Sequence, residues 1–187
     1  MPDLVELEKR IRQLEDREAI RELMYQYGRC IDNCLWDEVR GLFTEDVTTF
    51  YTDGALQLKG VDAILAMLTK AYTRERKKAG RGSVHLLVQP EVELLSDVTA
   101  HATFTFTYTD YDSATKKVMG QVAYYHNEFV KIGGQWKIKH IGYKLGFTPT
   151  YELPGLEIKP GKFSYQGGSD DAAIVPSKAP KAMAVRK

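Results

Sequence analysis

The stretch that most constrains the fold of this 187-residue chain runs from Ala19 to Phe43, AIRELMYQYGRCIDNCLWDEVRGLF. Its apolar residues recur at three- and four-residue steps: Ile20, Leu23, Met24, Tyr27 and Ile31. This spacing predicts an amphipathic helix with one apolar stripe, a break near Asp32 and Asn33, and a second helix that begins at Leu35 and Trp36. The mostly apolar face carries a phenol, Tyr27, and near its end a carboxylate, Asp32.

The position of Asp32 is the open question in this stretch. Asp32 follows Tyr27 by five residues, which is roughly 140° round a helix of 3.6 residues per turn. Geometry alone leaves it on the flank of the stripe, as a solvated acid or as the N-cap of the next helix. A carboxylate carried into the interior needs a partner or a changed protonation state, because burying it alone is costly. The candidate partner elsewhere in the chain is His85.

The chain after Phe43 has the pattern of a small hairpin, one more helix and a series of long strands. The expected segments are a hairpin over 47–58 with its turn at Asp53-Gly54, a helix over 60–78, and strands over 84–95, 100–111, 118–131 and 135–147. Pro90 predicts a bulge or an edge position in the first of these long strands. A change of apolar phase after His140 predicts a second bulge, or a strand covered on both sides.

This order of elements predicts an α+β fold with one curved antiparallel sheet. Side chains at 102, 104, 106 and 108 alternate cleanly with polar neighbours, as expected of a strand with one face in the core. The N-terminal helices are expected to pack on the concave face of the sheet. The sheet and helices together would form a cone with an internal pocket.

The two ends of the chain differ from this central domain. Residues 1–147 are expected to form one domain that begins with a helical arm over 1–15, in which Leu4, Leu7, Ile11 and Leu14 have an a/d spacing for two heptads. The arm is expected to pack on its own domain or on a neighbouring subunit, with a second helix starting near Asp16. Residues 148–187 are expected to be a C-terminal extension, partly mobile because 164–187 is rich in Gly, Ser, Ala and Pro.

Charge and hydropathy exclude several classes of function. The formal net charge is +1 with acids and bases interspersed, so no basic field is available for nucleic acid. No apolar run is long enough to span a membrane and the N-terminus does not have the pattern of a signal peptide, so a cytoplasmic protein is expected. Cys30 and Cys34 are four apart on the predicted helix and could share a face, and they are expected to be half-buried structural thiols rather than a disulfide or metal ligands. The basic run from Lys70 to Arg81 is expected to be a solvated face, or alternatively a cradle for an anionic group.

Four segments in this order resemble the SnoaL-like branch of the nuclear transport factor 2-like cone fold: LEDREAIRELMYQYGRCIDNCLWDEVRGLFTEDV, DGALQLKG, SVHLLVQPEV and FVKIGGQWKI. The resemblance covers about Leu14 to Phe147. Within that branch the chain looks most similar to small cofactor-free lyases: bile acid 7α-dehydratase, scytalone dehydratase and hexachlorocyclohexane dehydrochlorinase. These lyases are trimers, so the resemblance implies a homotrimer.

The resemblance assigns roles to four residues. Asp32, in CIDNC, and His85, in SVHLL, match the His–Asp dyad of these lyases, and Tyr27 and Tyr51 match the two pocket tyrosines of the bile acid enzyme. The arginines that these enzymes carry in the last strand align with Leu145, beside Lys144, and near His140. The second histidine of scytalone dehydratase has no match in GQVAYYHN. The dyad is retained while the substrate-polarising residues are not, which implies a different substrate.

The predicted function is therefore a dehydratase-type lyase without a cofactor or metal, acting on a hydrophobic, cyclic small molecule. The catalytic candidates are His85 as base, Asp32 as its orienting partner, and Tyr27 and Tyr51 as donors to the developing oxyanion. The substrate-binding candidates are His140, Lys144, Trp36, Phe104, Phe106 and Tyr125. An isomerase of the ketosteroid-isomerase type, or a non-catalytic small-molecule-binding or assembly module, stays open. His85 as a core histidine, and Tyr27 and Tyr51 as core aromatics, are the structural alternatives.

Overall fold

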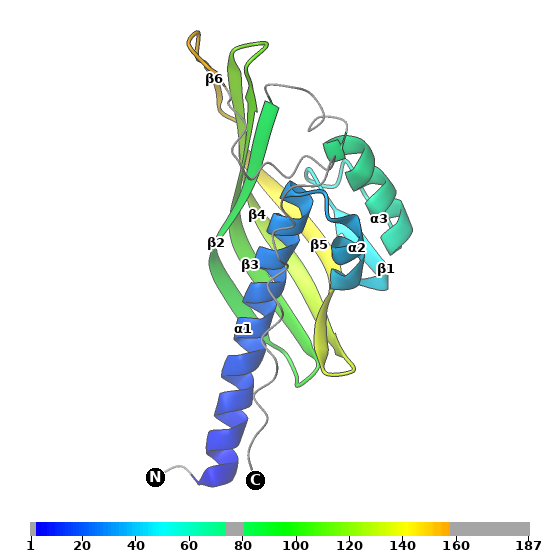
Figure 1. Cartoon of the computed structure of the whole chain (residues 1–187). Helices are drawn as coiled ribbons and strands as arrows, with labels where there is room; N and C mark the ends of the chain where they lie inside the picture. Colours follow the sequence, from blue (N-terminus) through cyan, green and yellow to red (C-terminus); the bar gives the residue numbers. More distant parts are fainter. Residues whose placement is uncertain (1–2, 74–80, 158–187) are drawn as a thin grey trace, which may run out of the picture.

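The computed structural model describes residues 3–73 and 81–157 (Figure 1). The elements, in chain order, are α1 (Leu4–Asp32), α2 (Trp36–Leu42), β1 (Phe43–Phe50), α3 (Val61–Leu68), the π-helical turn η1 (Thr69–Thr73), β2 (Arg81–Leu94), β3 (Thr99–Asp112), β4 (Lys117–Ile132), β5 (Gln135–Phe147) and β6 (Thr150–Glu152). The expected order of helices, hairpin, helix and long strands is confirmed. The described helices include none that is long and apolar enough to cross a membrane.

Five strands form one curved sheet in the order β1-β5-β4-β3-β2, and β6 adds to β4. The long strands β2 to β5 are antiparallel to their neighbours, as expected, but β1 pairs with β5 in parallel, so the sheet is mixed. A parallel pair requires a long crossover. The chain provides one between β1 and β5, through α3 and three further strands.

Both predicted bulges are present. The register of β2 against β3 shifts between Val88 and Glu91, around Pro90, and Gln89 has a φ of 52°. The register of β4 against β5 shifts between Glu128 and Phe129, which pair with His140 and Ile138. Lys139 is therefore the extra residue on β5. The bulge explains why the buried positions on β5 change from Trp136 and Ile138 to Ile141.

The helices differ from the expectation in two places. Asp3 caps α1 by accepting from the Glu6 N–H at 2.8 Å, and no second helix starts at Asp16. Asp16 instead lies inside α1 and accepts from Lys131 Nζ at 2.5 Å and Trp136 Nε1 at 2.9 Å. Cys34 lies beyond the end of α1 and has a φ of 55°, so it does not share a helical face with Cys30. The two cysteines form no disulfide.

The predicted helix over 60–78 is shorter in the structure. It begins at Val61 as α3, ends at Leu68 and continues only as the single turn η1 to Thr73. Lys70 is exposed, and the remainder of the predicted helix and most of the basic run lie outside the described residues. The segment 164–187, which is expected to be mobile, also lies outside the described residues. The predicted hairpin is confirmed, but its second half does not form a regular strand. It pairs with the first half through two isolated antiparallel bridges, Thr48 with Lys59 and Tyr51 with Leu56.

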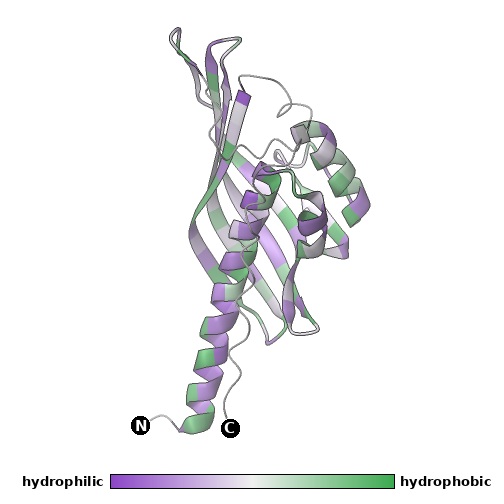
Figure 2. Ribbon diagram, viewed as in Figure 1, coloured by the Kyte–Doolittle hydropathy of each residue, from purple (hydrophilic) through white to green (hydrophobic). Residues whose placement is uncertain are grey.

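The helices pack on the concave face of the sheet and enclose one hydrophobic core (Figure 1). The apolar stripe predicted on the first helix is buried, with Ile20 and Met24 at 0% exposure. The alternation on β3 is confirmed too, because Ala102, Phe104 and Phe106 are buried while His101 is exposed. In Figure 2 the visible, outward side of α1 is mainly purple where the helix crosses the sheet.

Candidate active site

Asp32 is the last residue of α1, and its side chain faces β2. The helix can approach β2 closely because residue 28 is glycine: a Cβ there would lie 2.7 Å from Leu87 Cδ1. The helix end is completed by Asn33, whose Nδ2 donates to the Arg29 carbonyl at 2.7 Å. The N-cap of α2 is Leu35, which makes no side-chain cap bond. The alternative of Asp32 as the cap of the next helix is thus excluded.

Asp32 contacts His85 through both carboxylate oxygens. Asp32 Oδ1 lies 2.7 Å from His85 Nδ1, and Oδ2 accepts from the His85 backbone N–H at 2.9 Å. The side chains of Asp32 and His85 are 14% and 4% exposed. Because a carboxylate only accepts, this arrangement keeps the ring proton on Nδ1 and leaves Nε2 as the acceptor nitrogen.

Tyr72 contacts the other ring nitrogen of His85. It was not among the site residues predicted from the sequence. Its hydroxyl lies 3.2 Å from His85 Nε2. Tyr72 belongs to η1, the turn that follows α3. Burial, with a further contribution from Tyr108, raises the pKa of Tyr72, so the phenol stays protonated and can donate to Nε2. The sequence placed Tyr72 on the helix expected over 60–78. It did not indicate which side of that helix would face the sheet, so Tyr72 could not be assigned to the site.

Aromatic rings surround the imidazole of His85. Phe106 stacks on it with ring centroids 5.7 Å apart, and Tyr108 lies at 4.7 Å. Tyr125 and Tyr143 in turn contact Phe106, at 5.0 and 5.6 Å. Phe106 and Tyr125 are among the residues predicted to bind substrate, whereas Tyr108 and Tyr143 are not. The alternation along each strand could have indicated both residues. Tyr108 lies two positions after Phe106 on the same face of β3, and Tyr143 lies two positions after the buried Ile141 on β5.

The two tyrosines predicted as oxyanion donors contact each other. The hydroxyls of Tyr27 and Tyr51 lie 3.2 Å apart, and both rings are buried. Burial is the largest cause that raises the pKa of each, and the neighbouring Tyr51 and Tyr125 raise that of Tyr27 further. Burial likewise raises the pKa of Tyr125. These phenols are therefore neutral donors at physiological pH. In the pair, one hydroxyl donates to the other, and the second O–H can donate elsewhere.

Four predicted substrate-binding residues are not among these contacts around His85. His140 pairs with the exposed Glu128 and bonds Thr48 Oγ1 through Nδ1 at 2.7 Å. Lys144 is exposed and pairs with Tyr124, which is 47% exposed. Paired residues share a sheet face, so both lie on the convex side. Trp36 and Phe104 pack in the core.

Asp32 and His85 line a surface groove of about 400 Å³ between α1 and β2. The other lining residues are Tyr25, Arg29, Asn33, Leu86, Leu87 and Val88. Arg29 lies 3.5 Å from Glu38, so its charge is paired. In residues 3–73 and 81–157, no three His, Cys, Asp or Glu side chains come together as metal ligands would.

Known proteins share both the sequence pattern and the fold. The model of the family described as SnoaL-like domain matches residues 12–142. A nuclear transport factor 2-like protein with a cystatin-like fold from Novosphingobium aromaticivorans superposes with a TM-score of 0.67 at 29% identity, covering 78% of this chain and 91% of that chain.

Two further solved structures resemble the chain in fold. A proposed scytalone dehydratase from Novosphingobium aromaticivorans has a TM-score of 0.67 at 20% identity and covers 85% of this chain and 98% of that chain. A type 2 hexachlorocyclohexane dehydrochlorinase has a TM-score of 0.68 at 16% identity, with 81% and 98% covered.

Proposed function

Because the chain belongs to the SnoaL-like domain family, we propose that it is a cofactor-free lyase of hydrophobic small molecules, with His85 as general base. The observation that supports this most is the 2.7 Å contact between His85 Nδ1 and Asp32 Oδ1. If Asp32 were only a solvated acid and His85 only a core histidine, nothing would require this contact between their side chains. The acid–histidine pair orients an acceptor nitrogen toward a group of neutral phenols, which is the arrangement that proton abstraction requires.

The proposed reaction is a β-elimination. His85 Nε2 takes a proton from the carbon next to a carbonyl, and the electron pair of the broken C–H bond forms an enolate. Tyr27 and Tyr51 donate to the enolate oxygen. The enolate then reforms the carbonyl, creates the C=C bond and expels a hydroxyl at the β carbon. The imidazolium returns its proton to that hydroxyl, which leaves as water.

The substrate class follows from the side chains around His85. Phe106 and the rings of Tyr108, Tyr125 and Tyr143 offer apolar faces with hydroxyl groups at their edges. A ring-containing β-hydroxy ketone or thioester fits this lining, whereas an anionic substrate would gain no charge partner from Lys144, which lies on the convex side.

A panel of cyclic β-hydroxy ketones and thioesters tests the proposal, because elimination creates a conjugated product that absorbs in the ultraviolet. Turnover to the conjugated product supports the lyase. Movement of a double bond without loss of water identifies the isomerase. Saturable binding of these compounds with neither reaction identifies a non-catalytic binding module and overturns the proposal.

Tyr72→Phe is expected to lower kcat by about 10²-fold, the lower end of what one oxyanion donor contributes. When substrate binds, we propose that the Tyr72 hydroxyl moves from Nε2 to the substrate oxygen, which frees the base and adds a donor. Steady-state kinetics measure the change. Tyr124→Phe, which removes a half-exposed hydroxyl on the convex face, is the matched control. An unchanged kcat in Tyr72→Phe would show that Tyr72 only packs beside the imidazole.

The resemblance to trimeric lyases also leads us to propose a homotrimer. Light scattering on the purified chain is expected to give three times the 21.2 kDa mass of one chain. The mass of a single chain at micromolar concentration would contradict this assembly.

A further inference from the structure

The first three turns of α1, residues 4–14, extend beyond the sheet (Figure 1). We call this segment the arm. Among the described residues, no hydrogen bond or ion pair joins the arm to the strands; such bonds begin with Asp16 and Arg17. The apolar side chains of the arm are exposed, with Leu4 at 78%, Ile11 at 55% and Leu14 at 66%. The alternative that the arm packs on the described part of its own domain is therefore excluded.

The apolar stripe of the arm does not continue the stripe that faces the core. Leu4, Leu7, Ile11 and Leu14 cluster on one side of the helix. The buried residues from Ile20 to Ile31 cluster roughly 160° away at 3.6 residues per turn. α1 is one unbroken helix, so its own sheet cannot cover both stripes. The arm stripe points away from the body of the domain, where a second helix has room to lie.

The charges beside the arm stripe fit a parallel copy of the same helix. With Leu4 and Ile11 at a positions and Leu7 and Leu14 at d positions, Glu8, Glu15 and Glu22 occupy e, and Arg10 and Arg17 occupy g. In a parallel pair each g residue meets the e residue of the next heptad in the other chain, which sets Arg10 against Glu15, whereas Arg17 donates to the Val92 carbonyl of its own domain. An antiparallel pair would instead set Arg against Arg and Glu against Glu.

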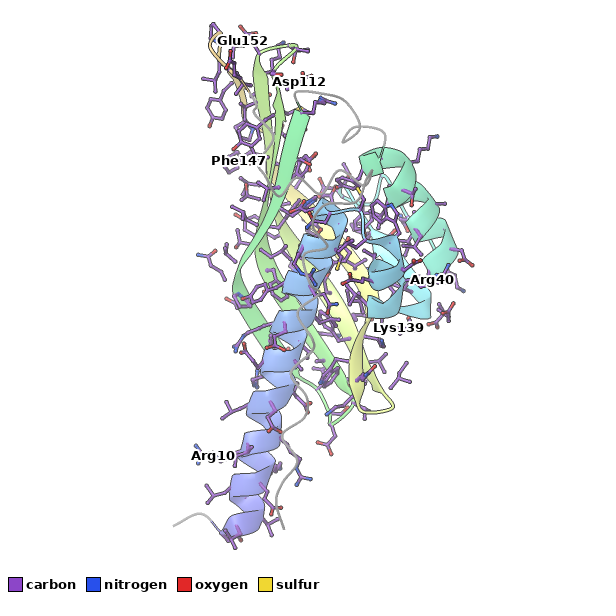
Figure 3. The ribbon with its side chains drawn as sticks, viewed as in Figure 1. Arg10, Arg40, Asp112, Lys139, Phe147 and Glu152 are labelled. Carbon is purple, nitrogen blue, oxygen red and sulfur yellow. The ribbon has the colours of Figure 1, made fainter. Side chains whose placement is uncertain are left out.

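We propose that the arm is a self-association element, in which the stripe of Leu4, Leu7, Ile11 and Leu14 packs in parallel and in register against the same stripe of a second copy of this chain. The domain bodies then lie on the outside of the associated arms, since each core-facing stripe points outward. Arg10, labelled on the arm in Figure 3, lies beside this contact and away from the sheet. Two heptads form a short contact, so the arm contributes only a part of the association free energy.

Cysteine cross-linking of the full chain tests the proposal. Leu7→Cys is a d position, where the Cα atoms of a parallel in-register pair come within disulfide range. Lys9→Cys lies on the same turn at an f position and is the matched control. Both are made with Cys34→Ser; Cys30 can stay, because it is buried and burial raises the pKa of its thiol to about 12. In a glutathione redox buffer, Leu7→Cys is expected to form at least about tenfold more covalent dimer than Lys9→Cys.

The outcomes separate the possible occupants of the stripe. Equal and low cross-linking of Leu7→Cys and Lys9→Cys would overturn the proposal, and would mean that another segment or no segment covers the stripe. Cross-linking that requires a mixture of Leu4→Cys and Leu14→Cys chains would overturn the parallel arrangement. A second measurement is the mass of Ile11→Asp by light scattering, which is expected to fall while the circular dichroism spectrum stays that of the wild type, since Ile11 is 55% exposed and lies outside the core of the described residues.

Discussion

Asp32→Asn is expected to lower kcat/KM by about 10²–10⁴-fold while the fold is kept. The reason is a forced change of tautomer. The His85 backbone N–H can only donate, so the oxygen of the introduced amide faces it, as Asp32 Oδ2 does at 2.9 Å. The amide NH₂ then faces Nδ1, which must accept, and the ring proton moves to Nε2. The nitrogen that should take the substrate proton is then protonated.

Two measurements check this expectation. Steady-state kinetics on the compound found in the panel give the loss of kcat/KM. ¹⁵N NMR of the ring nitrogens reports the tautomer without any substrate, and the proton is expected on Nδ1 in the wild type and on Nε2 in the variant. Asp37→Asn, which neutralises an exposed acid at the start of α2, is the control. Full activity in Asp32→Asn would remove Asp32 from the mechanism.

His85→Gln is expected to lower kcat by about 10²–10⁴-fold, the usual contribution of a general base. An amide of similar size has no nitrogen that can take a proton at physiological pH, but it can still donate to Asp32 Oδ1 and preserve the end of α1. KM is expected to change little, because Phe106 and the tyrosines that surround the site remain.

His101→Gln is the matched control, since His101 is exposed on β3. Circular dichroism and the unfolding midpoint establish that each variant is folded before its kinetics are compared. Elimination at the wild-type rate in folded His85→Gln would mean that another group is the base, and the lyase proposal would then lose its central residue.

Much of the fold could be predicted because each signal was local. The two-residue alternation predicted β3, and β5 was predicted with its observed bounds, Gln135–Phe147. Pro90 and the change of phase after His140 located both bulges. The parallel pairing of β1 could not be predicted in this way, because it depends on which sheet edge is left open after β2 to β5 have paired.

The site residues could be predicted where the family resemblance matched them to known positions. They were harder to predict where the prediction depended on which side of a strand or helix faces the interior. Asp32 and His85 are 53 residues apart in sequence, and no periodicity in either segment requires them to meet. His140 and Lys144 were expected in the pocket, but the bulge at Lys139 sets which side of β5 each of them occupies. Tyr72 was missed because η1 departs from the geometry of α3 just before it reaches His85.

The sequence by itself determined the elements, their order and the apolar faces, because these depend on residues a few positions apart and on the solvation of each side chain. Only the tertiary structure decided which polar groups share the interior. It placed both oxygens of Asp32 against His85, put Tyr72 on the remaining ring nitrogen and turned the arm stripe away from the core. The physical reason is that a hydrogen bond requires its two groups to lie within a few tenths of an ångström of the right distance, and only packing of the whole sheet against α1 fixes positions that closely.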